Sequence, residues 1–164
     1  MKTLYLLRHA KSSWGEPGLR DFDRPLNARG REAASLVGSY VGRKNLRPDL
    51  LLVSPATRAR ETAVLVAASA GLTPGLLLYD ERIYEADAAR LLAVVSSVED
   101  SARAAMLVGH NPGLEDVLAL LSGEARPMPT AALACLALDV GKWDEARPGA
   151  GRLEWLVTPQ DLDE

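Results

Sequence analysis

Short apolar segments that favour strands alternate with longer amphipathic segments that favour helices along nearly the whole chain. The predicted strands are Thr3–Leu7, Leu50–Val53, Leu76–Leu78, Ala104–Val108, Leu133–Val140 and Leu153–Val157. The predicted helices are Ala28–Arg43, the segment from Pro55 to about Ala70, Ala88–Val98, and the segment from Pro112 to about Leu121. This alternation predicts a three-layer α/β/α fold with a mostly parallel central sheet and helices on both faces. The sequence contains no internal repeat, and its 164 residues suit a single domain over residues 1–164.

Two of the predicted helices begin with the same local signal, a capping residue followed by proline. Ser54 precedes Pro55, and Asn111 precedes Pro112. Serine and asparagine side chains accept hydrogen bonds from free N–H groups, and proline suits the first helical position. We therefore expect two helix N-termini directly after strands, with their N–H groups pointing at the same edge of the sheet.

Charge and composition exclude several classes of protein. The net charge is -3 and the pI is about 5.5, which gives no basic field for nucleic acid or for an anionic membrane. No run approaches the roughly 20 apolar residues of a membrane-spanning helix. The single cysteine, Cys135, has no partner for an internal disulfide. We therefore expect a reducing, cytoplasmic setting and a buried, unreactive thiol.

Basic side chains follow three of the predicted strands at the point where each strand ends. Arg8 and His9 follow the first strand, Arg58 lies about one turn after Ser54, and His110 follows a later strand. Ligands of such sheets bind beyond the carboxyl ends of the strands, so we expect these side chains to converge. Each residue alone has a simpler explanation as a cap, a core residue or a solvated charge. Together, two arginines, two histidines and two helix N-termini suit a tetrahedral oxyanion such as phosphate.

The segments LLRHA, SPATRARET and VGHNPG resemble motifs of the histidine phosphatase superfamily, also called phosphoglycerate mutase-like. The resemblance spans Met1 to about Gly113. It implies the phosphoglycerate mutase-like fold and assigns roles residue by residue. By resemblance, the nucleophile is His9, the phosphate clamps are Arg8, Arg58 and His110, a further position near the phosphate is Ser12, and a backbone N–H that meets the phosphate belongs to Asn111.

The chemistry that these residues allow is covalent catalysis. A neutral nitrogen of His9 attacks phosphorus, and water then releases phosphate from the phosphohistidine. Arg8, Arg58 and a protonated His110 would stabilise the equatorial oxygens. A backbone carbonyl or a carboxylate is expected to fix the tautomer of His9. No metal and no cofactor is expected, because the protein supplies the cations and the histidines lack a metal-ligand spacing such as HExxH.

The acid that protonates a leaving alkoxide has three candidates. The segment YDERIYEA resembles the acid-bearing loop of the mutase branch of the superfamily. Its register favours Glu81, followed by Glu85 and then Asp80. Carboxylates in a loop are also commonly solvated without a catalytic role, and a phosphohistidine substrate leaves through nitrogen with a different demand for acid.

The length of the chain bears on the substrate. Little sequence separates Arg58 from His110, which leaves no room for an inserted cap over the site. The segment FDRPLNARGREAA is similar to one in the compact SixA-type phosphohistidine phosphatases. The expected partner is therefore a protein phosphorylated on histidine. The alternatives are a small phosphate ester as substrate, or a module that binds phosphate without turnover. The sequence indicates no particular oligomeric state.

Three further features lie around the predicted site or at the end of the chain. Many members of the superfamily have glycine after the first-motif histidine, where this chain has Ala10. The loop Ser13–Asp23 is expected to border the mouth of the site together with Lys11, and Trp14 is expected to pack in the core or at the rim. The acidic end Gln160–Glu164 is expected to be frayed.

Overall fold

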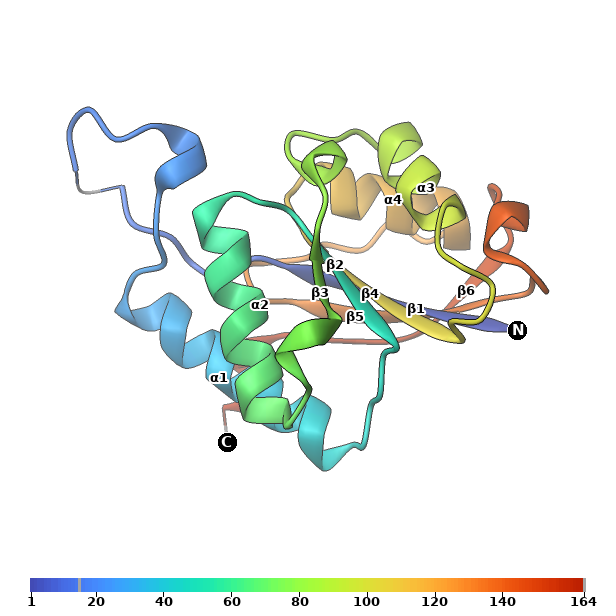
Figure 1. The fold of residues 1–164 in the computed structure, drawn as a ribbon, viewed down its shortest axis with the longest axis horizontal. Helices are drawn as coiled ribbons and strands as arrows, with labels where there is room; N and C mark the ends of the chain where they lie inside the picture. The colour runs from blue at the N-terminus through green and yellow to red at the C-terminus, as the bar shows by residue number, and fades with distance from the viewer. Residues whose placement is uncertain (15, 164) are drawn as a thin grey trace.

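The central sheet has six strands and is mostly parallel (Figure 1). The structure, a computed structural model, describes residues 1–14 and 16–163. The strands are β1 (Lys2–Arg8), β2 (Leu50–Val53), β3 (Leu77–Tyr79), β4 (Ala104–Gly109), β5 (Leu133–Leu138) and β6 (Gly151–Val157). Their order is β3-β2-β4-β1-β5-β6, and β5 runs antiparallel to both of its neighbours. The four strands from β3 to β1 pair in parallel, as the alternating pattern predicts.

Helices cover both faces of this sheet, which confirms the three-layer prediction. The pair α1 (Ala28–Arg43) and α2 (Thr57–Ala70) lies on one face, and the pair α3 (Ala88–Ser96) and α4 (Gly113–Ser122) lies on the other (Figure 1). A short helix, α5, follows β6 at Pro159–Leu162. The described residues also form the short 3-10 helices η1 (Asp21–Asp23), η2 (Pro74–Leu76), η3 (Glu81–Ile83) and η4 (Trp143–Glu145). Within the described residues, no helix is both long enough and apolar enough to span a bilayer.

The alternation of side chains along β1 divides the interior into two cores. Leu4 and Leu6 belong to the core under α3 and α4, and Tyr5 and Leu7 belong to the core under α1 and α2. The three leucines are completely buried, and burying one such side chain stabilises the fold by about 1.5–3 kcal/mol. Because both faces of β1 are covered, its sequence is a continuous apolar run rather than an alternating one.

The helices α2 and α4 begin within two residues of their predicted starts, at Thr57 and Gly113. The residue directly before each helix provides no side-chain cap. The Ser54 hydroxyl contacts Nε2 of His110, at 2.8 Å. The Asn111 side chain has local and tertiary partners, because Oδ1 accepts from the N–H of Glu115 at 3.4 Å and the amide nitrogen donates to a carboxylate on α4 and to a backbone carbonyl across the loop. Both residues carry a capping signal, and each combines a bond from a nearby backbone N–H with a tertiary contact.

Other boundaries agree with the sequence prediction to within two residues. The helix α1 matches its predicted range, and Oδ1 of Asn27 caps it by accepting from the N–H of Gly30 at 2.8 Å. The expectation of a frayed C-terminus was wrong for the residues in α5, because Thr158 and Asp161 form a capping box. Glu164 lies outside the described residues.

Candidate active site

Both histidines lie at the carboxyl ends of two adjacent parallel strands. The register pairs Arg8, the last residue of β1, with Gly109, the last residue of β4. The N–H of His9 donates to the Gly109 carbonyl at 3.0 Å, which extends this pairing by one step. The rings of His9 and His110 therefore meet, with centroids 5.1 Å apart. The sheet brings together two residues that are 101 positions apart in sequence.

A backbone carbonyl orients the ring of His9. Nδ1 lies 2.7 Å from the carbonyl oxygen of Ala10, so Nδ1 carries the ring proton and donates it. The N–H of Ala10 in turn donates to Oγ1 of Thr62 on α2, at 2.9 Å. Burial, followed by the nearby arginines, lowers the pKa of His9 to about 4. At neutral pH the ring is neutral, and its Nε2 carries a free lone pair suited to nucleophilic attack.

Both predicted arginines reach the same place, and each is held by backbone. Arg58, on the first turn of α2, donates from Nη1 to the Asp21 carbonyl at 2.7 Å and from Nη2 to the Asp21 carboxylate at 3.1 Å. Arg8 donates from Nη1 to the carbonyl of Met128 at 3.0 Å. Both arginines lie close enough to the His9 ring for their positive charge to lower its pKa. The structure thus brings Arg8, His9, Arg58 and His110 together.

The site contains buried hydrogen-bonding atoms without a partner. Among residues 1–14 and 16–163, the buried side-chain nitrogen and oxygen atoms that lack one are Nε of Arg8, Nε of Arg58 and Nδ1 of His110. Leaving a buried polar group unsatisfied costs about 1–3 kcal/mol, so such groups are rare outside functional sites. All three belong to the predicted phosphate cluster. Unpartnered arginine N–H donors beside two histidines suit a bound oxyanion.

The charge state of His110 differs from the expectation of a protonated ring. Burial lowers the pKa of His110, and the nearby His9 and Arg58 lower it further, to about 3. The ring is therefore neutral at neutral pH in the ligand-free protein. Ser54 Oγ accepts from the N–H of Ala56 at 3.3 Å and lies 2.8 Å from Nε2 of His110. A hydroxyl that donates to Nε2 leaves the ring proton on Nδ1, the nitrogen without a protein partner.

The loop after β1 contributes residues to the site that the sequence analysis did not single out. Asp21 on η1 binds Arg58 and also accepts from Nε of Arg24 at 3.1 Å and from the hydroxyl of Tyr84 at 2.7 Å. Partial burial raises the pKa of Asp21, but the hydrogen bonds from Tyr84, Arg58 and Arg24 outweigh it and lower the value to about 2. The segment DFDRP contains both Asp21 and Arg24, yet no local pattern shows that they reach the site.

Arg24 adds a further cation beside the two histidines. It is almost fully buried, and its charge also disfavours a proton on His9. Its Nη1 donates to Oγ of Ser12 at 2.6 Å, which places Ser12 beside the site as the resemblance implies. Its guanidinium lies 3.6 Å from the centroid of Trp14. The indole is 81% exposed, so Trp14 stacks at the rim, and packing in the core is excluded.

The remaining predicted residues occupy more peripheral positions. The side chain of Asn111 donates to Glu115 at 2.9 Å and to the Met128 carbonyl at 2.9 Å, so only its backbone is available to a ligand. Glu81 lies exposed on η3, and none of the described hydrogen bonds or ion pairs joins it to the histidines. Asp80 forms an ion pair with Arg82 at 2.7 Å. The role of Glu81 stays a prediction.

Acidification should destabilise the protein through its two histidines. Their folded-state pKa values lie below the unfolded value of 6.5, so below pH about 6.5 the unfolded chain binds more protons. The free energy of unfolding is therefore expected to fall from pH 7 to pH 5, by about 1.4 kcal/mol per pH unit for each histidine below 6.5. Urea unfolding at both pH values measures this loss. The variant His110→Gln should show a weaker dependence, and equal midpoints at the two pH values would contradict the expectation.

Comparison with known proteins identifies relatives over the whole chain. A sequence model of the histidine phosphatase superfamily (branch 1) matches residues 4–92. An uncharacterised chloroplastic protein of Arabidopsis thaliana is 34% identical, over 96% of this chain and 78% of its own length. The structure of a candidate phosphohistidine phosphatase SixA from Agrobacterium tumefaciens is 32% identical and superimposes with a TM-score of 0.81, covering 96% of this chain and 99% of that one. The protein histidine phosphatase SixA complexed with tungstate shares the fold, with a TM-score of 0.84 at 22% identity over 98% of this chain and 99% of that one.

Proposed function

Because the chain belongs to the histidine phosphatase superfamily, we propose that it is a phosphatase that hydrolyses phosphohistidine in another protein through a covalent intermediate on His9. The observation that carries the proposal is the group of three buried, unpartnered nitrogens beside the His9 ring. These nitrogens belong to Arg8, Arg58 and His110. They suit the oxygens of a phosphoryl group that is attacked by Nε2 of His9.

In the first step, the lone pair on Nε2 of His9 attacks phosphorus. The new N–P bond forms as the bond from phosphorus to the leaving nitrogen of the substrate breaks, and that nitrogen keeps the electron pair. The Ala10 carbonyl accepts a hydrogen bond from Nδ1–H throughout, at 2.7 Å, and stabilises the positive charge that develops on the ring. A histidine whose pKa is about 4 needs no deprotonation before it attacks at neutral pH.

Fixed positive charge stabilises the transferring group. The arginines Arg8, Arg24 and Arg58 are held by protein oxygens before substrate binds. Donors that are already in place cost no reorganisation during the reaction, and each contributes about 2.7–4 kcal/mol to such transition states. The neutral His110 contributes its Nδ1 proton as a further donor. Because these groups supply the positive charge, we propose that turnover requires no metal.

In the second step, water hydrolyses the phosphoenzyme. The water oxygen bonds to phosphorus, the N–P bond to His9 breaks, and Nε2 regains its lone pair. The water gives up one proton to solvent, and inorganic phosphate leaves. The same arginines stabilise both steps, because the phosphoryl group stays between the same oxygen-binding groups while the nucleophile and the leaving group change places.

A property of Asp21 favours phosphohistidine over a phosphate ester. An alkoxide leaving group needs a proton from an acid. The carboxylate that contacts Arg58 in this site is Asp21, and with a pKa of about 2 it is deprotonated at neutral pH. An imidazole leaving group takes its proton from solvent on the other ring nitrogen and departs neutral. The similarity to the candidate phosphohistidine phosphatase from Agrobacterium tumefaciens also favours this substrate.

The test compares two substrates under identical conditions. Phosphate release is measured from a protein phosphorylated on histidine and from glycerol phosphate, an alkyl ester whose leaving group needs an acid, each with and without a chelator. We expect turnover of the phosphohistidine protein that survives the chelator and a kcat/KM for the alkyl ester at least about 100-fold lower. Turnover of the alkyl ester alone would indicate a small-molecule phosphomonoesterase. Binding of phosphate without turnover of either substrate would indicate a binding module.

A further inference from the structure

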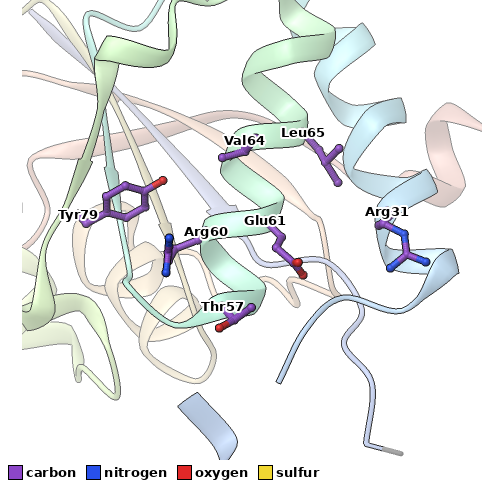
Figure 2. A pocket seen from close by; sticks show the side chains of 7 residues that line it. All are labelled: Arg31, Thr57, Arg60, Glu61, Val64, Leu65 and Tyr79. Carbon is purple, nitrogen blue, oxygen red and sulfur yellow. The ribbon is translucent and has the colours of Figure 1, made fainter. Parts of the chain in front are cut away.

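A groove of about 400 Å³ runs along the outer side of α2, beside the candidate active site (Figure 2). It begins at Thr57, the first residue of α2 and the neighbour of Arg58. Its opposite wall includes Tyr79, the last residue of β3. Tyr79 pairs with Val53, the last residue of β2, so it lies at the same carboxyl edge of the sheet as the two histidines. The groove therefore opens at the edge that carries the site.

Some of the large apolar side chains that line the groove are exposed to solvent and contribute little to the buried core. Tyr79 is 47% exposed, and Val64 in the middle of α2 is 52% exposed. Trp14, which stacks on Arg24 at the rim of the site, is also exposed. These three belong to the short set of large apolar side chains that the described chain leaves in solvent. Exposed apolar residues gathered beside a catalytic site are typical of a surface that a partner covers.

The charge of the groove is positive although the chain as a whole carries a net charge of -3. Arg60 and Arg31 are exposed on its walls, and the guanidinium of Arg60 lies 5.5 Å from the centroid of Tyr79. Glu61, the acidic residue of the groove, accepts from the N–H of Leu26 at 2.8 Å, and Arg31 donates from Nη1 to the Leu26 carbonyl at 3.0 Å. Two arginines and one glutamate leave the groove with an excess of positive charge. Figure 2 shows Arg60 extended toward Tyr79, with Glu61 and Arg31 on the other side of α2.

From this combination we infer that the groove docks an acidic amphipathic segment of the protein that carries the phosphohistidine. Apolar side chains of the segment contact Val64 and Tyr79, and its carboxylates face Arg31 and Arg60. This inference rests on the proposed function, because it assigns the groove to the substrate protein. Docking in the groove holds the phosphohistidine near His9 and so lowers KM. The chemical step depends on the buried histidines and arginines of the site, so docking leaves kcat unchanged.

The test uses two phosphohistidine peptides that differ only in charge. Both carry the same leucines beside the phosphohistidine, with glutamates between them in one and lysines in the other. We expect KM for the glutamate peptide to be lower than KM for the lysine peptide by about tenfold or more. Arg60→Glu and Val64→Glu should each raise that KM by about tenfold, while kcat, and kcat/KM for free phosphohistidine, change by less than about twofold. Both positions are exposed, so both variants should fold.

The matched control is Arg103→Glu. Arg103 is exposed and precedes β4, so the same charge reversal is placed at the opposite edge of the sheet. It should leave both KM values unchanged. Equal KM values for the two peptides, or equal effects of Arg60→Glu and Arg103→Glu, would overturn the inference. A dimer lost in Val64→Glu with unchanged peptide kinetics would also overturn it, because the groove would then bind a second copy of this chain.

A binding measurement separates this inference from the proposed function. Fluorescence anisotropy of the unphosphorylated glutamate peptide reports docking without any chemistry. Binding that is weakened by Arg60→Glu but not by Arg103→Glu supports the groove even where no phosphohistidine substrate is hydrolysed. Failure to hydrolyse the phosphohistidine protein and both phosphohistidine peptides refutes the proposed function alone. Failure of the unphosphorylated peptide to bind the wild-type protein, with hydrolysis intact, refutes the groove alone.

Discussion

Replacing His9 with alanine is expected to lower kcat for phosphohistidine hydrolysis by about 10⁴-fold or more. The variant lacks the nitrogen that forms the covalent intermediate, so water must attack the substrate directly. The arginines remain in place, because they are held by the carbonyls of Met128 and Asp21 rather than by His9. Residual activity should therefore come from electrostatic stabilisation alone. Single-turnover phosphate release from a phosphohistidine peptide measures the loss.

Trapping the intermediate separates loss of the nucleophile from loss of the site. A reaction with radiolabelled substrate, quenched in alkali, should leave label on the wild-type protein and none on His9→Ala. Inorganic phosphate should still inhibit or bind the variant, because the three unpartnered nitrogens include none from His9. Label that persists on His9→Ala would assign the intermediate to another residue. Unchanged kcat would refute covalent catalysis by His9.

Replacing Arg58 with alanine is expected to lower kcat/KM by about 10²–10³-fold. Arg58 is nearly buried, and its Nε has no protein partner, so its removal leaves a phosphoryl oxygen without a fixed donor. The substitution also removes the hydrogen bonds from Arg58 to Asp21, which help to hold η1 over the site. Steady-state kinetics with free phosphohistidine measures the effect without any contribution from a protein surface.

Arg58→Lys distinguishes the geometry of the guanidinium from its charge. Lysine keeps the positive charge but cannot donate in a planar fork to both Asp21 and phosphate. We expect its kcat/KM to lie between those of the wild type and Arg58→Ala. The exposed Arg103, changed to alanine, should retain wild-type kinetics. Equal values for Arg58→Ala and Arg103→Ala would contradict a role for Arg58 in binding the phosphoryl group.

Much of the fold and the main members of the site were predictable from the sequence, for identifiable reasons. The run at β1 is apolar because both of its faces are buried, and this local signal predicts a strand inside a covered sheet. In such a sheet, residues that follow parallel strands meet at one edge. That rule, applied to His9 and His110, was sufficient to bring together two rings that the structure places 5.1 Å apart.

Local signals were incomplete where a side chain also has a partner distant in sequence. Ser54 and Asn111 carry the signature of N-caps and accept from the N–H groups of Ala56 and Glu115, yet Ser54 also contacts His110 and Asn111 also donates to the Met128 carbonyl. The local bonds follow from the sequence, whereas the tertiary contacts depend on where the partner lies in space. The sequence contains no information on that position until the strands have paired.

The residue types at the ends of β1, β2 and β4 were therefore determined by the sequence itself, together with the order in which the chain presents them. The tertiary structure decided the protonation states, the tautomers and the hydrogen-bond partners of those residues. Packing buries the rings of His9 and His110 and keeps both neutral, and the Ala10 carbonyl selects the tautomer of His9. Folding of the loop after β1 brings Asp21 and Arg24 to the same point. Protonation and hydrogen bonding depend on solvent exclusion and on neighbours in space, and both arise only when distant segments pack together.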